Sequence, residues 1–194
     1  MKKILVLVVM FTVIFAAAIH SAECGQTESN GDTPKILIAY FSKTNNTKTI
    51  AEYIHSLAGG DMYHITTKRQ YPADYNETLQ VARAELDNNE RPELADAISP
   101  EDMKNYDVIF IGHPIWFGNL PMAVVAFLEQ YDLSGKTVIP FCTYGRGGPR
   151  QSASDIAKLC PNSTVLQGFG TEGNSVNKAE DDVAAWLRQI GYLK

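Results

Sequence analysis

The sequence is poor in cysteine, and this scarcity excludes several kinds of site. The chain has three cysteines, of which only Cys142 and Cys160 fall inside the candidate domain, and neither belongs to a C-x-x-C pair. Structural zinc sites and dithiol redox sites use such pairs, so we expect neither a metal centre nor a redox dithiol. A disulfide between these two residues stays open for an exported protein.

Basic charge and nucleotide-binding motifs are also lacking. The chain has 17 Lys and Arg against 22 Asp and Glu, a net charge of -5 at pH 7. This mild acidity argues against nucleic acid as a partner. No G-x-x-x-x-G-K-[ST] phosphate loop and no G-x-G-x-x-G dinucleotide fingerprint is present. Internal repeats are absent as well.

One long apolar run is present, and it lies at the start of the sequence. Lys2 and Lys3 precede an apolar run over residues 4–19, which small and polar residues follow. This order is typical of a secretory signal. A membrane helix needs ~20 apolar residues, so the run favours export over a retained span. We therefore expect residues 1–23 to be a signal peptide, and the protein to be periplasmic or tethered outside the cytoplasm.

The cleavage site of this signal decides whether the exported chain carries a lipid anchor. Cleavage before Cys24 predicts a lipid anchor on that residue, which is the only membrane attachment we expect. Cleavage after Ala18 or Ala22 leaves Cys24 as an ordinary thiol. Residues 24–33 are polar and predict a flexible tether. Residues 34–194 suit one domain with its own core, and we expect a monomer.

Five short apolar runs alternate with helical patterns across this domain. The expected strands are Lys35–Phe41, Met62–Thr66, Val108–Gly112, Thr137–Cys142 and Thr164–Phe169. The expected helices are Thr47–Ala58, Asn76–Asn89, Pro121–Tyr131, Gln151–Leu159 and Lys178–Ile190. We interpret Ser99-Pro100 as a break before the third strand. The alternation predicts an α/β fold with a parallel sheet and helices on both faces. Ligands of such sheets bind at the carboxyl ends of the strands.

Hydroxyl and amide side chains follow the first expected strand, in "SKTNNT" from Ser42 to Thr47. A helix begins at this point, and a helix start offers unpaired N–H groups and a partial positive charge. The segment therefore predicts a phosphate cradle. An ordinary helix cap is the alternative, because Asn and Thr also favour that position.

Aromatic residues and glycines follow the third and fourth expected strands. "GHPIWFGNLP" contains Trp116 and Phe117, and "CTYGRGGPRQS" combines Tyr144 with three glycines. Aromatic rings at a strand end either cover the core or face a flat ligand. The glycines either let the backbone approach a ligand or form a flexible surface loop. Taken together, the three loops predict a ligand with a phosphate at one end and a flat ring at the other.

With these loops in this order, the chain resembles the flavodoxin family. "SKTNNT" is similar to the family's phosphate loop, T-x-T-G-x-T, while "PIWFGNLP" and "TYGRGG" are similar to its two ring-binding loops. "YPADY" and "FLEQYDLSGKTVIPFCT" resemble one subgroup of these domains. The resemblance covers residues 34–194. It implies a flavodoxin-like three-layer sandwich whose five-stranded parallel sheet has the order 2-1-3-4-5.

The resemblance also implies FMN as cofactor, and it assigns the loop residues to parts of that molecule. The implied phosphate-binding residues are Ser42, Thr44, Asn45, Asn46 and Thr47. Trp116 is implied to stack on one face of the flavin ring and Tyr144 to cover the other. The remaining implied ring contacts are Pro114, Ile115, Phe117, Gly118, Thr143, Gly145 and Gly147. Asn45 stands where the family usually has glycine, and Asn tolerates left-handed backbone angles better than most residues.

The protein would tune the flavin's chemistry, so no separate catalytic residue is implied. We expect the Phe117–Gly118 peptide to rotate on reduction, so that its carbonyl accepts the hydrogen on flavin N5. His113 either tunes a proton near the ring or satisfies the backbone of its loop.

Three functions fit this sequence. The first is electron transfer between protein partners, with a redox partner that the sequence does not identify. The second is an NAD(P)H-dependent flavin or quinone reductase, which makes the protein an enzyme. The third is a flavin-free binding module of the same fold.

Overall fold

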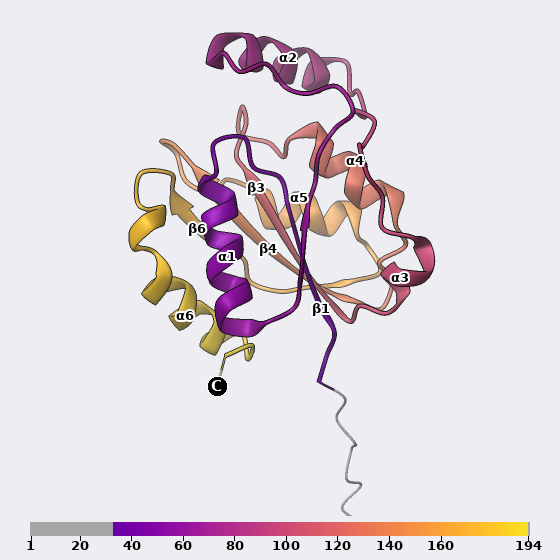
Figure 1. Ribbon diagram of the computed structural model, residues 1–194, viewed down its shortest axis with the longest axis vertical. Coiled ribbons are helices and arrows are strands. Elements are labelled where there is room, and N and C mark those ends of the chain that lie inside the picture. The colour runs from indigo at the N-terminus through magenta and orange to yellow at the C-terminus, as the bar shows by residue number, and fades with distance from the viewer. Residues whose placement is uncertain (1–32, 194) are drawn as a thin grey trace, which may run out of the picture. The chain divides into compact units, whose positions relative to one another are not determined.

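A computed structural model describes residues 33–193, in which a parallel sheet carries helices on both faces (Figure 1). The strands are β1 (Ile36–Tyr40), β2 (Asp61–His64), β3 (Val108–Pro114), β4 (Thr137–Tyr144), β5 (Thr164–Val165) and β6 (Phe169–Glu172). The helices are α1 (Asn46–Ala58), α2 (Tyr75–Asp87), α3 (Pro100–Lys104), α4 (Met122–Gln130), α5 (Ser152–Leu159), η1 (Val176–Lys178) and α6 (Glu180–Gln189). The expected signal, Cys24 and nearly all of the expected tether lie outside the described residues.

The sheet has the order β2-β1-β3-β4-β5, which confirms the predicted topology. The fifth expected strand, Thr164–Phe169, is divided into β5 and β6, and both pair with β4 in parallel. Pro140 of β4 lies between the two paired regions. Because proline has no N–H to donate, the ladder is interrupted there and resumes at Phe141 beside Phe169. The last strand then continues to Glu172, beyond its predicted end.

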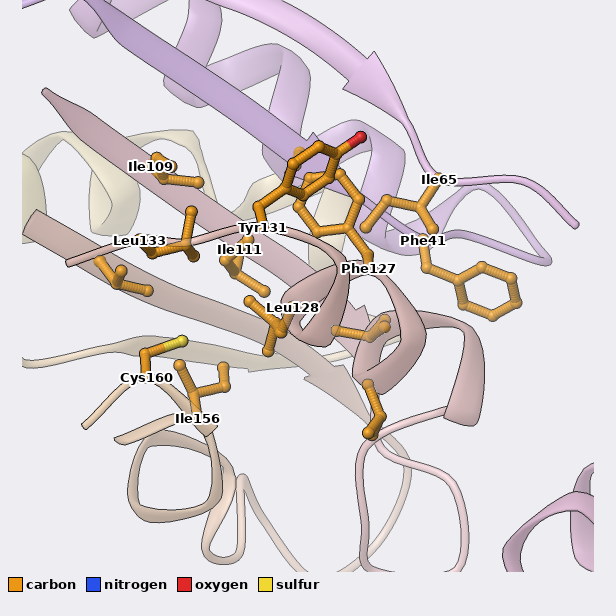
Figure 2. Close-up of a cluster of buried hydrophobic side chains, with 14 of the residues drawn as sticks. Phe41, Ile65, Ile109, Ile111, Phe127, Leu128, Tyr131, Leu133, Ile156 and Cys160 are labelled. Carbon is orange, nitrogen blue, oxygen red and sulfur yellow. The ribbon is translucent and has the colours of Figure 1, made fainter. Parts of the chain in front are cut away.

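The central strands β1, β3 and β4 bury both faces, as their continuous apolar sequences predict. On one face, Ile38 and Phe110 pack with α1 and α6 through residues such as Ile54, Val183 and Leu187. On the other face, alternate residues of the same strands pack with α4 and α5. Figure 2 shows this second cluster, in which Ile111 of β3 lies near Leu128 of α4, and Ile156 of α5 lies near Cys160.

Two helices depart from the expected arrangement. Ser99-Pro100 does not merely break the chain but begins α3, where the Ser99 hydroxyl accepts the Asp102 N–H at 3.1 Å. A serine cap followed by proline at the first helical position is a helix-start signal, so this interpretation was wrong. Helix α2 exists as predicted, but it lies beyond the carboxyl ends of the strands (Figure 1). Within residues 33–193, no helix combines the length and apolar character that crossing a bilayer requires.

Candidate ligand-binding site

A cavity of about 700 Å³ opens at the carboxyl edge of the sheet. Residues of all three predicted loops line it: Ser42, Thr44, Asn46, Thr47, Pro114, Ile115, Trp116, Thr143, Tyr144 and Gly145. Asn45, Phe117, Gly118 and Gly147 belong to the same loops but do not line the cavity. The tertiary structure thus brings the three loops together.

The first loop presents the start of α1 to the cavity. Asn45 adopts the left-handed conformation, with φ of 65°, and its side chain makes no capping hydrogen bond. The N–H groups of Asn46 and Thr47 therefore receive no cap from Asn45 and remain donors for a ligand. Ser42 Oγ accepts the Lys48 N–H at 3.2 Å. An ordinary cap by Asn45, the alternative considered for this segment, is not what the structure has.

Thr47 connects the first loop to the end of β4. Its side chain is 1% exposed, and its Oγ1 lies 2.9 Å from Thr143 Oγ1. One hydroxyl donates to the other, so both of these buried side chains have a hydrogen-bond partner. The donor-rich loop is thereby fixed to the strand that leads into Tyr144.

The second loop is a tight turn that holds Trp116 at the cavity wall. Trp116 and Asn119 exchange two backbone hydrogen bonds of 3.1 and 2.8 Å. Phe117 and Gly118 have φ of 52° and 81°, the sign that type I′ turns require at both central positions. The Asn119 side-chain amide donates to the Phe117 carbonyl at 2.9 Å. The expected rotation of this peptide would have to break that bond.

Trp116 is positioned by two other aromatic rings. The edge-on contacts of its indole to Phe41 and Tyr71 have centroid distances of 5.2 Å each. Such geometry is the favoured one for aromatic pairs. One possibility for Trp116 was a ring that only covers the core, but the indole is half-buried and lines the cavity.

The third loop gains a neighbour that the sequence analysis missed. Because β6 runs beside β4 in register, Glu172 lies opposite Tyr144, and Gly173 donates its N–H to the Tyr144 carbonyl at 2.8 Å. A Cβ on Gly173 would lie 2.6 Å from Asn46 Nδ2, so a larger residue there would displace the Asn46 side chain. The fifth strand was expected to end at Phe169, which placed these residues outside the site.

Other lining residues were missed as well. Lys43 and Arg146 lie within predicted loops, and Asn174 follows Gly173. Ala73, Tyr75, Thr78 and Leu79 come from α2 and the residue pair before it. The "YPADY" segment was the available signal for α2, but the strand–helix alternation assigned that helix to a face of the sheet.

A buried polar network lies behind the second and third loops. His113 is fully buried, its Nδ1–H donates to the Pro114 carbonyl at 3.0 Å, and its Nε2 accepts the Ser152 hydroxyl at 2.7 Å. Burial lowers the pKa of His113 to about 4, so the ring is neutral at pH 7. Of the two roles considered for this residue, the structure shows the one that satisfies the loop's backbone.

Neither cysteine of the described chain forms a disulfide. Cys142 and Cys160 are both buried and free. Burial raises the pKa of Cys142 to about 12 and that of Cys160 to about 11, so both remain thiols. Among residues 33–193, no group of three or more His, Cys, Asp and Glu side chains is arranged to hold a metal ion.

Comparison with known proteins identifies a matching family and similar solved structures. A family model described as flavodoxin matches residues 35–190. A candidate flavoprotein from Bacteroides eggerthii is 33% identical, with a TM-score of 0.68, and covers 81% of this chain and 98% of its own. A flavoprotein from Lactobacillus acidophilus, solved in complex with FMN, is 26% identical, with a TM-score of 0.59, and covers 75% of this chain and 97% of its own.

A curated relative matches over a shorter region. The NAD(P)H dehydrogenase (quinone) of Cupriavidus metallidurans is 30% identical over 96 residues, which are 50% of this chain and 46% of that protein. The chain thus spans about half the length of this relative.

Proposed function

The chain belongs to the flavodoxin family, and on this premise we propose that it binds FMN and transfers electrons through it. The observation that carries the proposal is a single cavity that joins a helix start, whose first two N–H groups receive no cap from Asn45, to Trp116 and Tyr144. FMN has a phosphate and a flat ring, so the two ends of this cavity match its two ends in chemistry. The similar protein from Lactobacillus acidophilus, in complex with FMN, supports this choice of cofactor.

The chain's own residues have three tasks in this proposal. Backbone N–H groups of Asn46 and Thr47, with the hydroxyl of Thr44, hold the phosphate. Trp116 and Tyr144 enclose the ring, and Gly145 faces open space where backbone groups can approach it. When bound, FMN supplies reversible electron acceptance, which no side chain of the protein provides.

The cofactor assignment is tested by comparing FMN with riboflavin, which lacks the phosphate. We expect the purified domain to bind FMN with flavin absorbance bands and to bind riboflavin more weakly. Thr44→Ala removes one donor to a charged group, which weakens FMN binding about tenfold and leaves riboflavin binding unchanged. Thr164→Ala, on the distant β5, is the matched control and should change neither affinity. Equal affinity for both flavins would contradict a phosphate cradle.

Reductase activity is the second candidate, favoured by the similarity to the NAD(P)H dehydrogenase (quinone) of Cupriavidus metallidurans. Rapid mixing of the FMN-loaded protein with NADPH separates the two. A carrier keeps its yellow colour on this timescale, whereas a reductase bleaches within milliseconds to seconds. Protein that shows no flavin bands after FMN is added would instead support the flavin-free binding module.

The proposal includes the location and the partner. We infer that the domain acts outside the cytoplasm, attached by a lipid on Cys24 or released as a monomer, and exchanges electrons with another protein. The order of charged, apolar and small residues over 1–23 supports export.

A further inference from the structure

A second, smaller cavity adjoins the first loop and has no assigned ligand. Its volume is about 180 Å³, and Ser42 and Lys43 line both this cavity and the larger one. The other lining residues lie at the end of β1, at the end of β2 and in the segment that follows β2, over residues 64–67 and 70–71. None of the proposed FMN contacts comes from these two ranges.

Hydrogen bonds and ring contacts hold the walls of this smaller cavity in one arrangement. The Thr66 carbonyl accepts the Ala95 N–H at 2.9 Å, so the segment after β2 is tied to a distant stretch of chain. The Tyr71 ring contacts Phe41 edge-on at 5.5 Å, and its hydroxyl donates to the buried carboxylate of Glu85 at 2.7 Å. The cavity is therefore formed by segments that tertiary contacts fix, not by a loose surface loop.

His64 is the second basic residue of the wall, and its ring is also held in place. It stacks on Tyr40, its register partner in β1, with ring centroids 5.0 Å apart and an angle of 9° between the planes. Burial lowers the pKa of His64, so the ring is neutral at pH 7. A neutral imidazole still offers one N–H donor.

Lys43 gives the smaller cavity its charge. Of the described residues that line this cavity, none is acidic. Two neighbouring lysines have carboxylate partners, since Lys48 pairs with Glu52 and Lys68 pairs with Glu93. Lys43 has no such partner within residues 33–193. An unpaired ammonium group in a concave site attracts an anion.

The size and the lining of the cavity select the kind of anion. Cavities that hold drug-sized ligands have volumes of roughly 300–1,000 Å³, so this one takes a smaller molecule. Phe41, Ile65 and Tyr71 give it an apolar base, which favours a ligand with a hydrocarbon part. Thr66 and Gln70 add a hydroxyl and an amide that can donate to a carboxylate beside Lys43.

We propose that this cavity binds a small carboxylate anion with a short hydrocarbon chain, whose carboxylate is held by Lys43, Thr66 and Gln70. The proposal goes beyond the FMN function, because it adds a second ligand at a separate cavity. It does not depend on that function, since residues 64–71 form the site whether or not a flavin is bound.

The test is a titration with sodium butyrate, followed by NMR of the histidine rings. FMN is first added to saturation, so that the phosphate loop is occupied, and loading is read from absorbance. Failure to load counts against the proposed function alone, and the titration is then run on the flavin-free protein. We expect butyrate to shift the ring signal of His64, assigned with His64→Gln, in a saturable way. The signal of His55, at the other end of α1, should not shift.

Three variants locate the carboxylate. Lys43→Met keeps the apolar stem but removes the charge, and should weaken butyrate binding about tenfold. Gln70→Ala should weaken it about threefold and leave FMN binding unchanged, because Gln70 does not line the larger cavity. Lys68→Met, which removes a nearby lysine that lines neither cavity, is the matched control and should leave butyrate affinity unchanged.

A neutral probe separates recognition of the carboxylate from general apolar binding. 1-Butanol has a chain of the same length and should bind at least about tenfold more weakly than butyrate. Equal affinity for the two probes would overturn the proposal. So would the absence of a saturable His64 shift, an equal shift of His55, or unchanged butyrate affinity in both Lys43→Met and Gln70→Ala.

Discussion

Phe117, in the turn beside the cavity, has an unusual backbone conformation for a bulky residue. Phe117 is a bulky residue at positive φ, a conformation that costs of order 1–3 kcal/mol and tends to occur at functional sites. Its carbonyl is held by Asn119 and its ring by Arg83. The strain is therefore maintained by contacts from the turn itself and from α2.

His113 predicts a pH dependence of stability. Its pKa in the folded protein is about 4, against 6.5 in an unfolded chain, because burial disfavours the charged ring. Below pH 6.5 the unfolded chain binds a proton that the folded protein does not. Stability is therefore full above pH 6.5 and falls as the pH decreases toward 4, by roughly 3 kcal/mol over that window.

Urea unfolding at pH 7.5 and at pH 5.0 measures this effect while most carboxylates stay ionised. Burial also lowers the pKa of His64, so this residue contributes with the same sign. We expect His113→Gln to be less stable at pH 7.5, since the contacts to Ser152 and Pro114 are altered, but to depend less on pH than wild type. His64→Gln serves as the comparison and should flatten the dependence less. A wild-type pH dependence in His113→Gln would contradict the assignment.

At the scale of elements, α2 is the helix whose place beside the cavity the sequence did not predict. Unlike α1 and α4, it covers no sheet face with a continuous apolar stripe, and its buried residues are Thr78, Ala82 and Glu85. Polar contacts therefore hold α2 in place, whereas apolar packing holds the helices on the sheet. The Asp74 carboxylate accepts the Glu77 N–H at 2.9 Å and caps the helix start.

Tyr71→Phe tests how far α2 depends on the buried carboxylate. The substitution keeps the ring beside Trp116 but leaves one oxygen of Glu85 without its 2.7 Å partner. An unsatisfied buried acceptor costs roughly 1–3 kcal/mol, so the midpoint of urea unfolding should fall. Tyr75→Phe, whose side chain is 70% exposed, should change the unfolding free energy by less than about 0.5 kcal/mol. Equal effects of the two variants would show that the Glu85 contact does not stabilise α2.

At the scale of the molecule, the site belongs to no single segment. It gathers residues 42–47, the start of α2, the ends of β3 and β4, and residues 172–174. Only the assembled parallel sheet brings these segments to one edge. FMN binding should therefore stabilise the whole domain, in proportion to the logarithm of the FMN concentration.

Export is the prediction that belongs to the full chain. Expressed in a Gram-negative host, the protein should appear outside the cytoplasm with a mass that lacks the first 18 to 23 residues, whereas a chain that starts at residue 24 should remain inside. Labelled palmitate should enter the wild-type protein and not Cys24→Ser if cleavage occurs before that cysteine. Mass spectrometry of the fractions checks both outcomes. Full-length protein confined to the cytoplasm would contradict export.

The sequence by itself determined the class of fold and much of the cavity's lining. Apolar runs of strand length alternate with helical periodicity, and a parallel sheet is the arrangement that buries both. Because parallel strands end at one edge, the loops after β1, β3 and β4 had to meet. That is why Ser42, Trp116 and Tyr144 could be predicted to share a site without any coordinates.

Only the tertiary structure decided where α2 lies, where the last strand ends and what His113 does. Periodicity reports which residues of a helix are buried but not what covers them, so α2 was assigned to the sheet instead of the cavity. The pairing of β6 with β4 continues to Glu172 opposite Tyr144, and the local pattern of apolar residues does not reveal that pairing. The state of His113 likewise depends on Ser152, 39 residues away, and on burial that local sequence does not encode.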